Sequence, residues 1–115
     1  MEVARVVPIF PEGVYLNTLK RKLTKKEISF AKYQKTVKNA GNIYSEDNYI
    51  LNKPPFKKLK KEITEFVEDY FKLIISTKDK IKPYVTQSWL NYTSDNEYHH
   101  QHFHPNSFLS GVFYF

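Results

Sequence analysis

The chain has 115 residues, of which 41% are hydrophobic and 17% aromatic, a composition typical of one globular domain and not of a disordered chain. It contains no cysteine, which excludes disulfides and thiolate metal sites. The net charge is +6, but residues 1–82 hold all 18 Lys and Arg against 10 acids, or +8, whereas residues 83–115 hold only Asp95, Glu97 and the four histidines.

The first elements are predicted from the alternation of apolar and polar residues and from helix-capping signals. Val3 to Ile9 alternates weakly and is bounded by proline, which predicts a short edge strand. A helix is predicted to begin at Thr24, because Thr24 can cap the helix while the side chain of Glu27 reaches back to it. This helix is predicted to end near Ala40, with Gly41 as its stop.

The remaining elements are a loop, a second helix and two strands. Residues 41–53 are polar and predict a loop. A second helix is predicted from Pro55 to about Ile75, because apolar residues recur there at three- and four-residue spacings. Residues 84–93 and 108–115 are rich in aromatic and β-branched residues, which predicts strands.

Helices first and strands after indicate an α+β fold in a single domain, 1–115. Residues 1–82 would form a helical N-terminal part, packed on an antiparallel sheet that begins at residue 83. The apolar segment 108–115 would present an exposed edge. We therefore expect either a homo-oligomer formed through these C-terminal strands or a chain truncated from something longer, and we favour truncation.

All four histidines lie within six positions, 99 to 104. On an extended strand His100, His102 and His104 share one face, and β-carbons two residues apart are about 7 Å from each other. Two such imidazoles can chelate one ion with metal–nitrogen bonds of roughly 2.0–2.1 Å. We therefore predict a metal site at His102 and His104, with His100 as a further candidate. No third ligand is evident.

These histidines belong to a longer pattern that covers residues 87–115. It consists of Trp89-x-Asn91, followed by His102-x-His104-Pro105-Asn106-Ser107-x-Leu109-Ser110-Gly111-Val112-x-Tyr114. This pattern resembles the 2-oxoglutarate/Fe(II)-dependent oxygenases (dioxygenases) found often in marine bacteria and their phages. The resemblance is loose over the rest of the chain.

The resemblance implies a double-stranded β-helix, the jelly-roll or cupin-like fold, with Fe(II) and 2-oxoglutarate as cofactors. His102 would be the first metal ligand. His104 stands where the family has an acidic residue, so another divalent metal is an open alternative. Tyr114, Ser110 and Asn91 are candidates for cofactor binding, and no catalytic residue is assigned. The family's distal His and Arg have no counterpart here, so we expect the chain alone to be incomplete and inactive.

Two alternatives stay open. One is a cupin-like metal-binding protein without oxygenase activity. The other is a basic nucleic-acid-binding module using Lys57, Lys58, Lys60 and Lys61, which is disfavoured because acidic residues follow on the same helix. The substrate, a small molecule or a peptide, is not identified. No apolar run approaches the roughly 20 residues that span a bilayer, so we expect a cytoplasmic protein, in the host cytoplasm if a phage encodes it.

Overall fold

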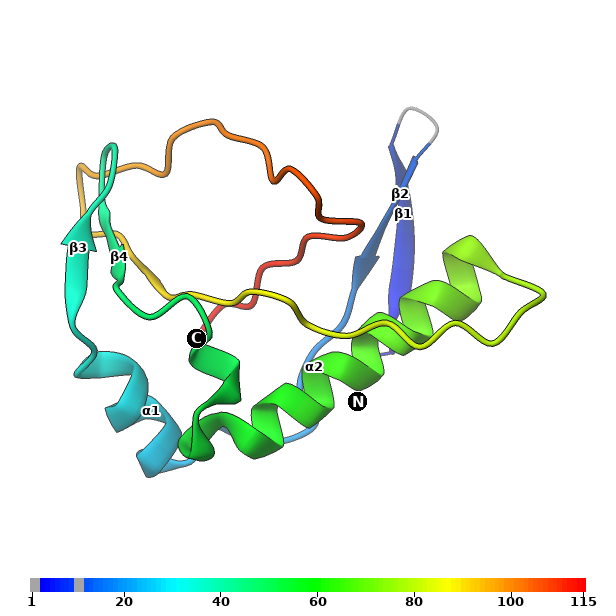
Figure 1. The fold of residues 1–115 in the computed structure, drawn as a ribbon, viewed down its shortest axis with the longest axis horizontal. Coiled ribbons are helices and arrows are strands. Elements are labelled where there is room, and N and C mark those ends of the chain that lie inside the picture. Colours follow the sequence, from blue (N-terminus) through cyan, green and yellow to red (C-terminus); the bar gives the residue numbers. More distant parts are fainter. Residues whose placement is uncertain (1–2, 10–11) are drawn as a thin grey trace.

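The structure, a computed structural model, describes residues 3–9 and 12–115. It has two antiparallel sheets and two main helices (Figure 1). One sheet is the hairpin of β1 (Arg5–Ile9) and β2 (Glu12–Leu16). The other has the order β3 (Thr36–Lys38), β4 (Ile43–Ser45) and β5 (Asn91–Tyr92). The α+β class is confirmed, whereas the double-stranded β-helix stays a prediction.

The first helix follows the β1–β2 hairpin in the sequence, and the second lies between β4 and β5. The first is α1 (Lys25–Lys32). Two short 3₁₀ turns, η1 (Ile50–Asn52) and η2 (Pro54–Phe56), lead into α2 (Lys57–Tyr70), which continues as the π-helical turn η3 (Phe71–Ile75). The predicted second helix is therefore confirmed. No helix in the described part of the chain has the length and apolar character needed to cross a bilayer.

The core forms where α1, the short turns and the start of α2 meet. Its buried residues are Ala31, Ile50, Leu51, Phe56 and Leu59. The ring of Phe56 lies edge-on to Phe30 at 4.9 Å and is stacked with Phe115 at 6.3 Å between centroids. The C-terminus consequently ends beside the short turns (Figure 1), so the last residues pack on a core built from the first half of the chain.

One arginine joins the two helices through a largely buried ion-pair cluster. The guanidinium of Arg21 donates to both carboxylate oxygens of Glu27 in α1, at 2.7 and 2.8 Å, and to Glu62 in α2, at 2.7 and 2.9 Å. Glu27 is only 2% exposed and also accepts from the backbone of Thr24, as the predicted capping box requires. Hydrogen bonds from Arg21 lower the pKa of Glu27 from 4.5 to about 2.

Three predictions of secondary structure in the first half of the chain are wrong. The first helix ends at Lys32 and not near Ala40, because Thr36–Lys38 extends and pairs with Ile43–Ser45. Gly41, with φ +86°, lies in the turn between these strands and does not stop a helix. The polar loop predicted over 41–53 contains β4 and η1.

The predicted C-terminal strands are mostly absent. Of residues 84–93 only Asn91–Tyr92 forms a strand, and 108–115 forms none in the described structure, since no neighbouring strand pairs with its backbone. The predicted order of helices before strands is also wrong, because four of the five strands precede residue 82. Aromatic and β-branched composition favours an extended backbone, but a strand also needs a partner.

Candidate metal centre

The segment before the histidines is fixed to the first half of the chain by backbone hydrogen bonds. Ser45, which is fully buried, exchanges hydrogen bonds with the backbone of Leu90 at 2.8 and 2.9 Å. Ser88 donates its N–H to Asn48 at 2.9 Å and accepts at its carbonyl from Ile50 at 3.0 Å. These bonds place Trp89, which lies between Ser88 and Leu90, beside the histidines.

The histidine segment itself, 99–104, forms no strand, so the predicted shared strand face is wrong. Turns at Asn96 (φ 68°) and Asn106 (φ 60°) bracket the segment, and asparagine tolerates such angles better than most residues. Just before it, the N–H of Tyr98 donates to the carbonyl of Gly41 at 3.1 Å. The histidine segment thus has a turn at each end, and a hydrogen bond to the β3–β4 turn fixes the end at Tyr98.

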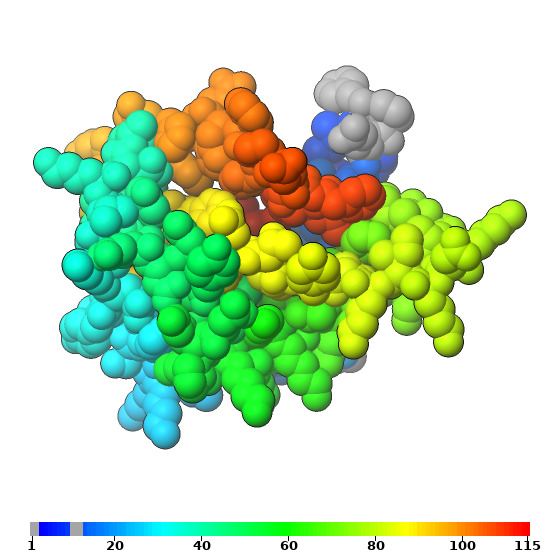
Figure 2. All heavy atoms as spheres, in the orientation of Figure 1, coloured from blue at the N-terminus to red at the C-terminus, as the bar shows by residue number. Residues whose placement is uncertain are grey.

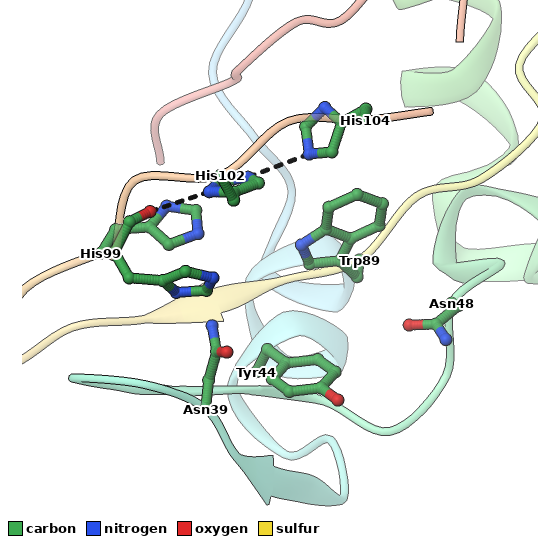
Figure 3. Close-up of a pocket in the computed structure, with 8 residues that line it drawn as sticks. Asn39, Tyr44, Asn48, Trp89, His99, His102 and His104 are labelled. Atoms are coloured by element: carbon green, nitrogen blue, oxygen red, sulfur yellow. Dashed lines mark hydrogen bonds between the residues drawn. The ribbon is translucent and has the colours of Figure 1, made fainter. Parts of the chain in front are cut away.

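His102 and His104 nevertheless converge, through a chain of hydrogen bonds (Figure 3). The Nδ1–H of His102 donates to the carbonyl of His100 at 2.8 Å, which leaves Nε2 of a neutral His102 as an acceptor. In that tautomer, Nε2–H of His104 donates to that atom at 2.9 Å. Nδ1 of His104 then accepts from the Ser110 hydroxyl at 2.8 Å. Both Nε2 atoms therefore face each other, and both Nδ1 atoms are anchored elsewhere.

An open pocket of about 210 Å³ adjoins these rings. Its lining residues are Asn39, Tyr44, Asn48, Trp89, His99, His100, His102 and His104. Figure 3 shows Asn39 and Tyr44 on one side, with the labelled histidines opposite them. In Figure 2 the surface is hollowed between the segment around residue 100, in orange, and the segment around residue 85, in yellow. Trp89 packs edge-on to His104 at 5.4 Å and limits its rotation.

The two histidines before this pair complete a dense imidazole cluster. Partial desolvation, followed by the neighbouring imidazoles of His102, His100 and His104, lowers the pKa of His99 from its ordinary value of 6.5. Nδ1 of His100 is buried and has no hydrogen-bond partner. A buried polar atom without a partner costs free energy, which a bound water molecule or ion would recover.

These residues fit a divalent metal ion. Two nitrogens bound at 2.0–2.1 Å and at right angles on one ion lie about 2.9 Å apart, which equals the observed separation of 2.9 Å between the Nε2 atoms of His102 and His104. Hydrogen bonds at the opposite ring nitrogens are also the usual means of orienting ligating histidines. Binding an ion would require His104 to carry its proton on Nδ1 and donate it to the Ser110 hydroxyl. Both rings would also have to tilt, so that their Nε2 lone pairs point at the ion and not at each other.

The fit to 2-oxoglutarate is poorer. The part of the chain that the structure describes contributes no Lys or Arg to the lining of this pocket, so no cation faces it to pair with a distal carboxylate. Of the three residues predicted to bind the cofactor, Ser110 donates to His104. Tyr114 is 85% exposed and Asn91 lies exposed in β5, and neither of them lines the pocket. Sequence reasoning missed Asn39, Tyr44 and Asn48, which lie far from the motif and carry no signal of their own.

The Ser110 hydroxyl gives a testable prediction. Ser110→Ala removes the hydrogen bond that orients His104 but leaves both histidines in place. We expect metal affinity to fall by about 10–100-fold, as is usual when such an orienting partner is lost, measured by competition with a chromophoric chelator. Ser107→Ala is the matched control, because the Ser107 hydroxyl donates to the carbonyl of Leu109 and not to a histidine. Equal affinities of the two variants would contradict the orienting role of Ser110.

Comparison with known proteins gives one match. Residues 87–115 match the family described as "Putative 2OG-Fe(II) oxygenase". The matched segment contains Trp89, His102, His104 and Ser110, so the family resemblance is supported where the candidate metal centre lies. No significant match was found among curated proteins or solved structures.

Proposed function

We propose that this chain binds a divalent metal ion through Nε2 of His102 and Nε2 of His104, as part of a non-haem Fe(II)/2-oxoglutarate-dependent oxygenase site. The observation that carries the proposal is the pair of facing Nε2 atoms, 2.9 Å apart, with both Nδ1 atoms held by other groups. The family match over residues 87–115 suggests Fe(II) and 2-oxoglutarate by resemblance.

The surroundings of the pair support metal binding. Residues 83–115 contain no Lys or Arg, so no resident cation of this segment repels an ion. Trp89 provides an apolar contact on one side of His104. When bound, Fe(II) would supply the redox centre through which this family uses O₂. The chain's own residues would hold the ion and shape the pocket beside it.

The proposal is tested by metal uptake. The chain is purified without a polyhistidine tag, equilibrated with Co(II) or, without oxygen, with Fe(II), and freed of unbound metal before elemental analysis. We expect about one ion per chain for the wild type and none for His102→Ala/His104→Ala, because no pair of facing nitrogens is left at this position.

Gln101→Ala is the matched control, since Gln101 is exposed and lies between the same histidines. It should bind metal as the wild type does. Circular dichroism must show that the double variant is folded, which we expect because His102 and His104 are exposed and outside the core. Equal uptake by the wild type and a folded double variant would rule out this site.

Association of two chains is a separate proposal, based on exposed apolar residues. Phe108, Val112 and Tyr114 are 76%, 78% and 85% exposed, and they lie close together in the sequence. Clustered exposed apolar residues often mark an interface. We infer a homo-oligomer that buries residues 108–115.

A further inference from the structure

We propose that His100 is the third protein ligand of this metal, so that the centre is held by three imidazoles and no carboxylate. This inference rests on the proposed metal site at His102 and His104. It differs from the ligand set that the family resemblance implies, which includes an acidic residue two positions after the first histidine.

The position of His100 is the first reason. His99, His100 and His102 each offer one ring nitrogen, and these nitrogens lie within 4.8 Å of one another. Two ligands bound at 2.0–2.1 Å to one ion are at most about 4.2 Å apart. The grouped nitrogens of His100 and His102 therefore lie within about 1 Å of a separation that one ion allows. His104 is outside this group and would join the centre through its Nε2, 2.9 Å from Nε2 of His102. The rings of His100 and His102 are already 5.0 Å apart between centroids.

The buried nitrogen of His100 is the second reason. His100 is half-buried, whereas His99 is exposed, and Nδ1 of His100 is the one buried side-chain polar atom without a hydrogen-bond partner among the described residues. The carbonyl of the same residue already accepts from Nδ1–H of His102. Binding a metal would give the unpaired nitrogen a partner. It would also use a residue whose backbone is already hydrogen-bonded to His102.

The absence of a nearby carboxylate is the third reason. Within residues 3–9 and 12–115, the grouped candidate ligands are histidines alone, and no Asp or Glu lines the pocket. Glu97 is exposed and accepts from the backbone of Ser94 at 3.2 Å, as a turn residue does. Imidazole ligands suit Zn(II), Cu(II), Ni(II) and Fe(II), and the general order of affinities at such sites places Fe(II) below the other three. We therefore infer that the chain binds Zn(II) and Ni(II) more tightly than Fe(II).

The test compares single variants by Zn(II) affinity and by the visible absorption of bound Co(II). His100→Ala should weaken Zn(II) binding by about 100-fold or more, since even the loss of an orienting partner costs 10–100-fold. It should also change the Co(II) spectrum, because water would replace an imidazole. His99→Ala should leave both almost unchanged. Wild-type protein loaded with Fe(II) should lose the ion to one equivalent of Zn(II).

Each outcome separates this inference from the proposed function. If His102→Ala/His104→Ala abolishes binding but His100→Ala binds as the wild type does, the pair stands and His100 is not a ligand. If His99→Ala weakens binding and His100→Ala does not, the third ligand is His99 and the inference is wrong. If the double variant binds as tightly as the wild type, the proposed function fails. Retention of Fe(II) against Zn(II) would contradict the inferred order of metal affinities.

Discussion

Arg21→Met is expected to lower the free energy of unfolding by about 3–5 kcal/mol, the usual cost of removing one partner from a buried ion pair. Glu27, 2% exposed, would lose two hydrogen bonds and keep a buried charge, while Glu62 would lose its link to α1. Urea unfolding followed by circular dichroism measures the change.

Lys35→Met provides the matched control. Lys35 pairs with Glu46 at 3.1 Å, but the two side chains are 83% and 51% exposed. Exposed pairs contribute about 1 kcal/mol or less, because water screens them. A loss for Arg21→Met no greater than that for Lys35→Met would show that the Arg21 cluster does not hold the two helices together.

The same cluster makes the free energy of unfolding depend on pH. The pKa of Glu27 is about 2 in the folded chain against an ordinary value of 4.5, with hydrogen bonds from Arg21 as the main cause. A lowered folded-state pKa stabilises the fold above the unfolded value, so this contribution is present above pH 4.5 and is lost as the pH falls toward 2. Glu27→Gln should accordingly flatten the stability curve in that interval.

Gly41→Ala is expected to disturb the metal centre from a distance. With φ at +86°, Gly41 adopts a conformation that strains an alanine. An added β-carbon would also lie 2.5 Å from the carbonyl oxygen of Tyr98 and 2.8 Å from its ring, so Tyr98 would have to move, and His99 follows it directly. We expect a stability loss of about 1–3 kcal/mol together with weaker Zn(II) binding.

Gly111→Ala is the control for this substitution. A β-carbon at Gly111 would meet no atom within 4 Å, although the residue lies in the same motif as the histidines. Its stability and Zn(II) affinity should match those of the wild type. If Gly41→Ala also binds Zn(II) as tightly as the wild type does, the β3–β4 turn does not position the histidine segment.

Local signals in the sequence predicted the helices better than the strands. Thr24 and Glu27 form the predicted capping box, and the apolar spacing after Pro55 produces α2. By contrast, Ile43–Ser45 pairs both with Thr36–Lys38 and with residues 90–92, which lie far along the chain. A capping signal needs only neighbouring residues, whereas a three-residue strand is defined by its partner.

The candidate site shows the same difference between features that neighbouring residues determine and features that distant residues determine. The prediction that His102 and His104 lie together needs only their spacing, and the structure brings their Nε2 atoms to 2.9 Å. The strand predicted to achieve this does not form, and the turn at Asn106 instead brings Ser110 to His104. Asn39 and Tyr44 reach the pocket from the β3–β4 hairpin, and no local pattern in the sequence indicates that contact.

The central claim is tested most directly by the ring nitrogens themselves. In the chain labelled with ¹⁵N-histidine, two-bond ¹H–¹⁵N spectra report which nitrogen of each ring carries a proton or a metal, with signals assigned through single His→Ala variants. One equivalent of Zn(II) should shift Nε2 of both His102 and His104 to the metal-bound range. Their Nδ1 atoms should be protonated, facing the His100 carbonyl and the Ser110 hydroxyl. Unchanged Nε2 signals, or metal bound through Nδ1 of either ring, would contradict the proposed site.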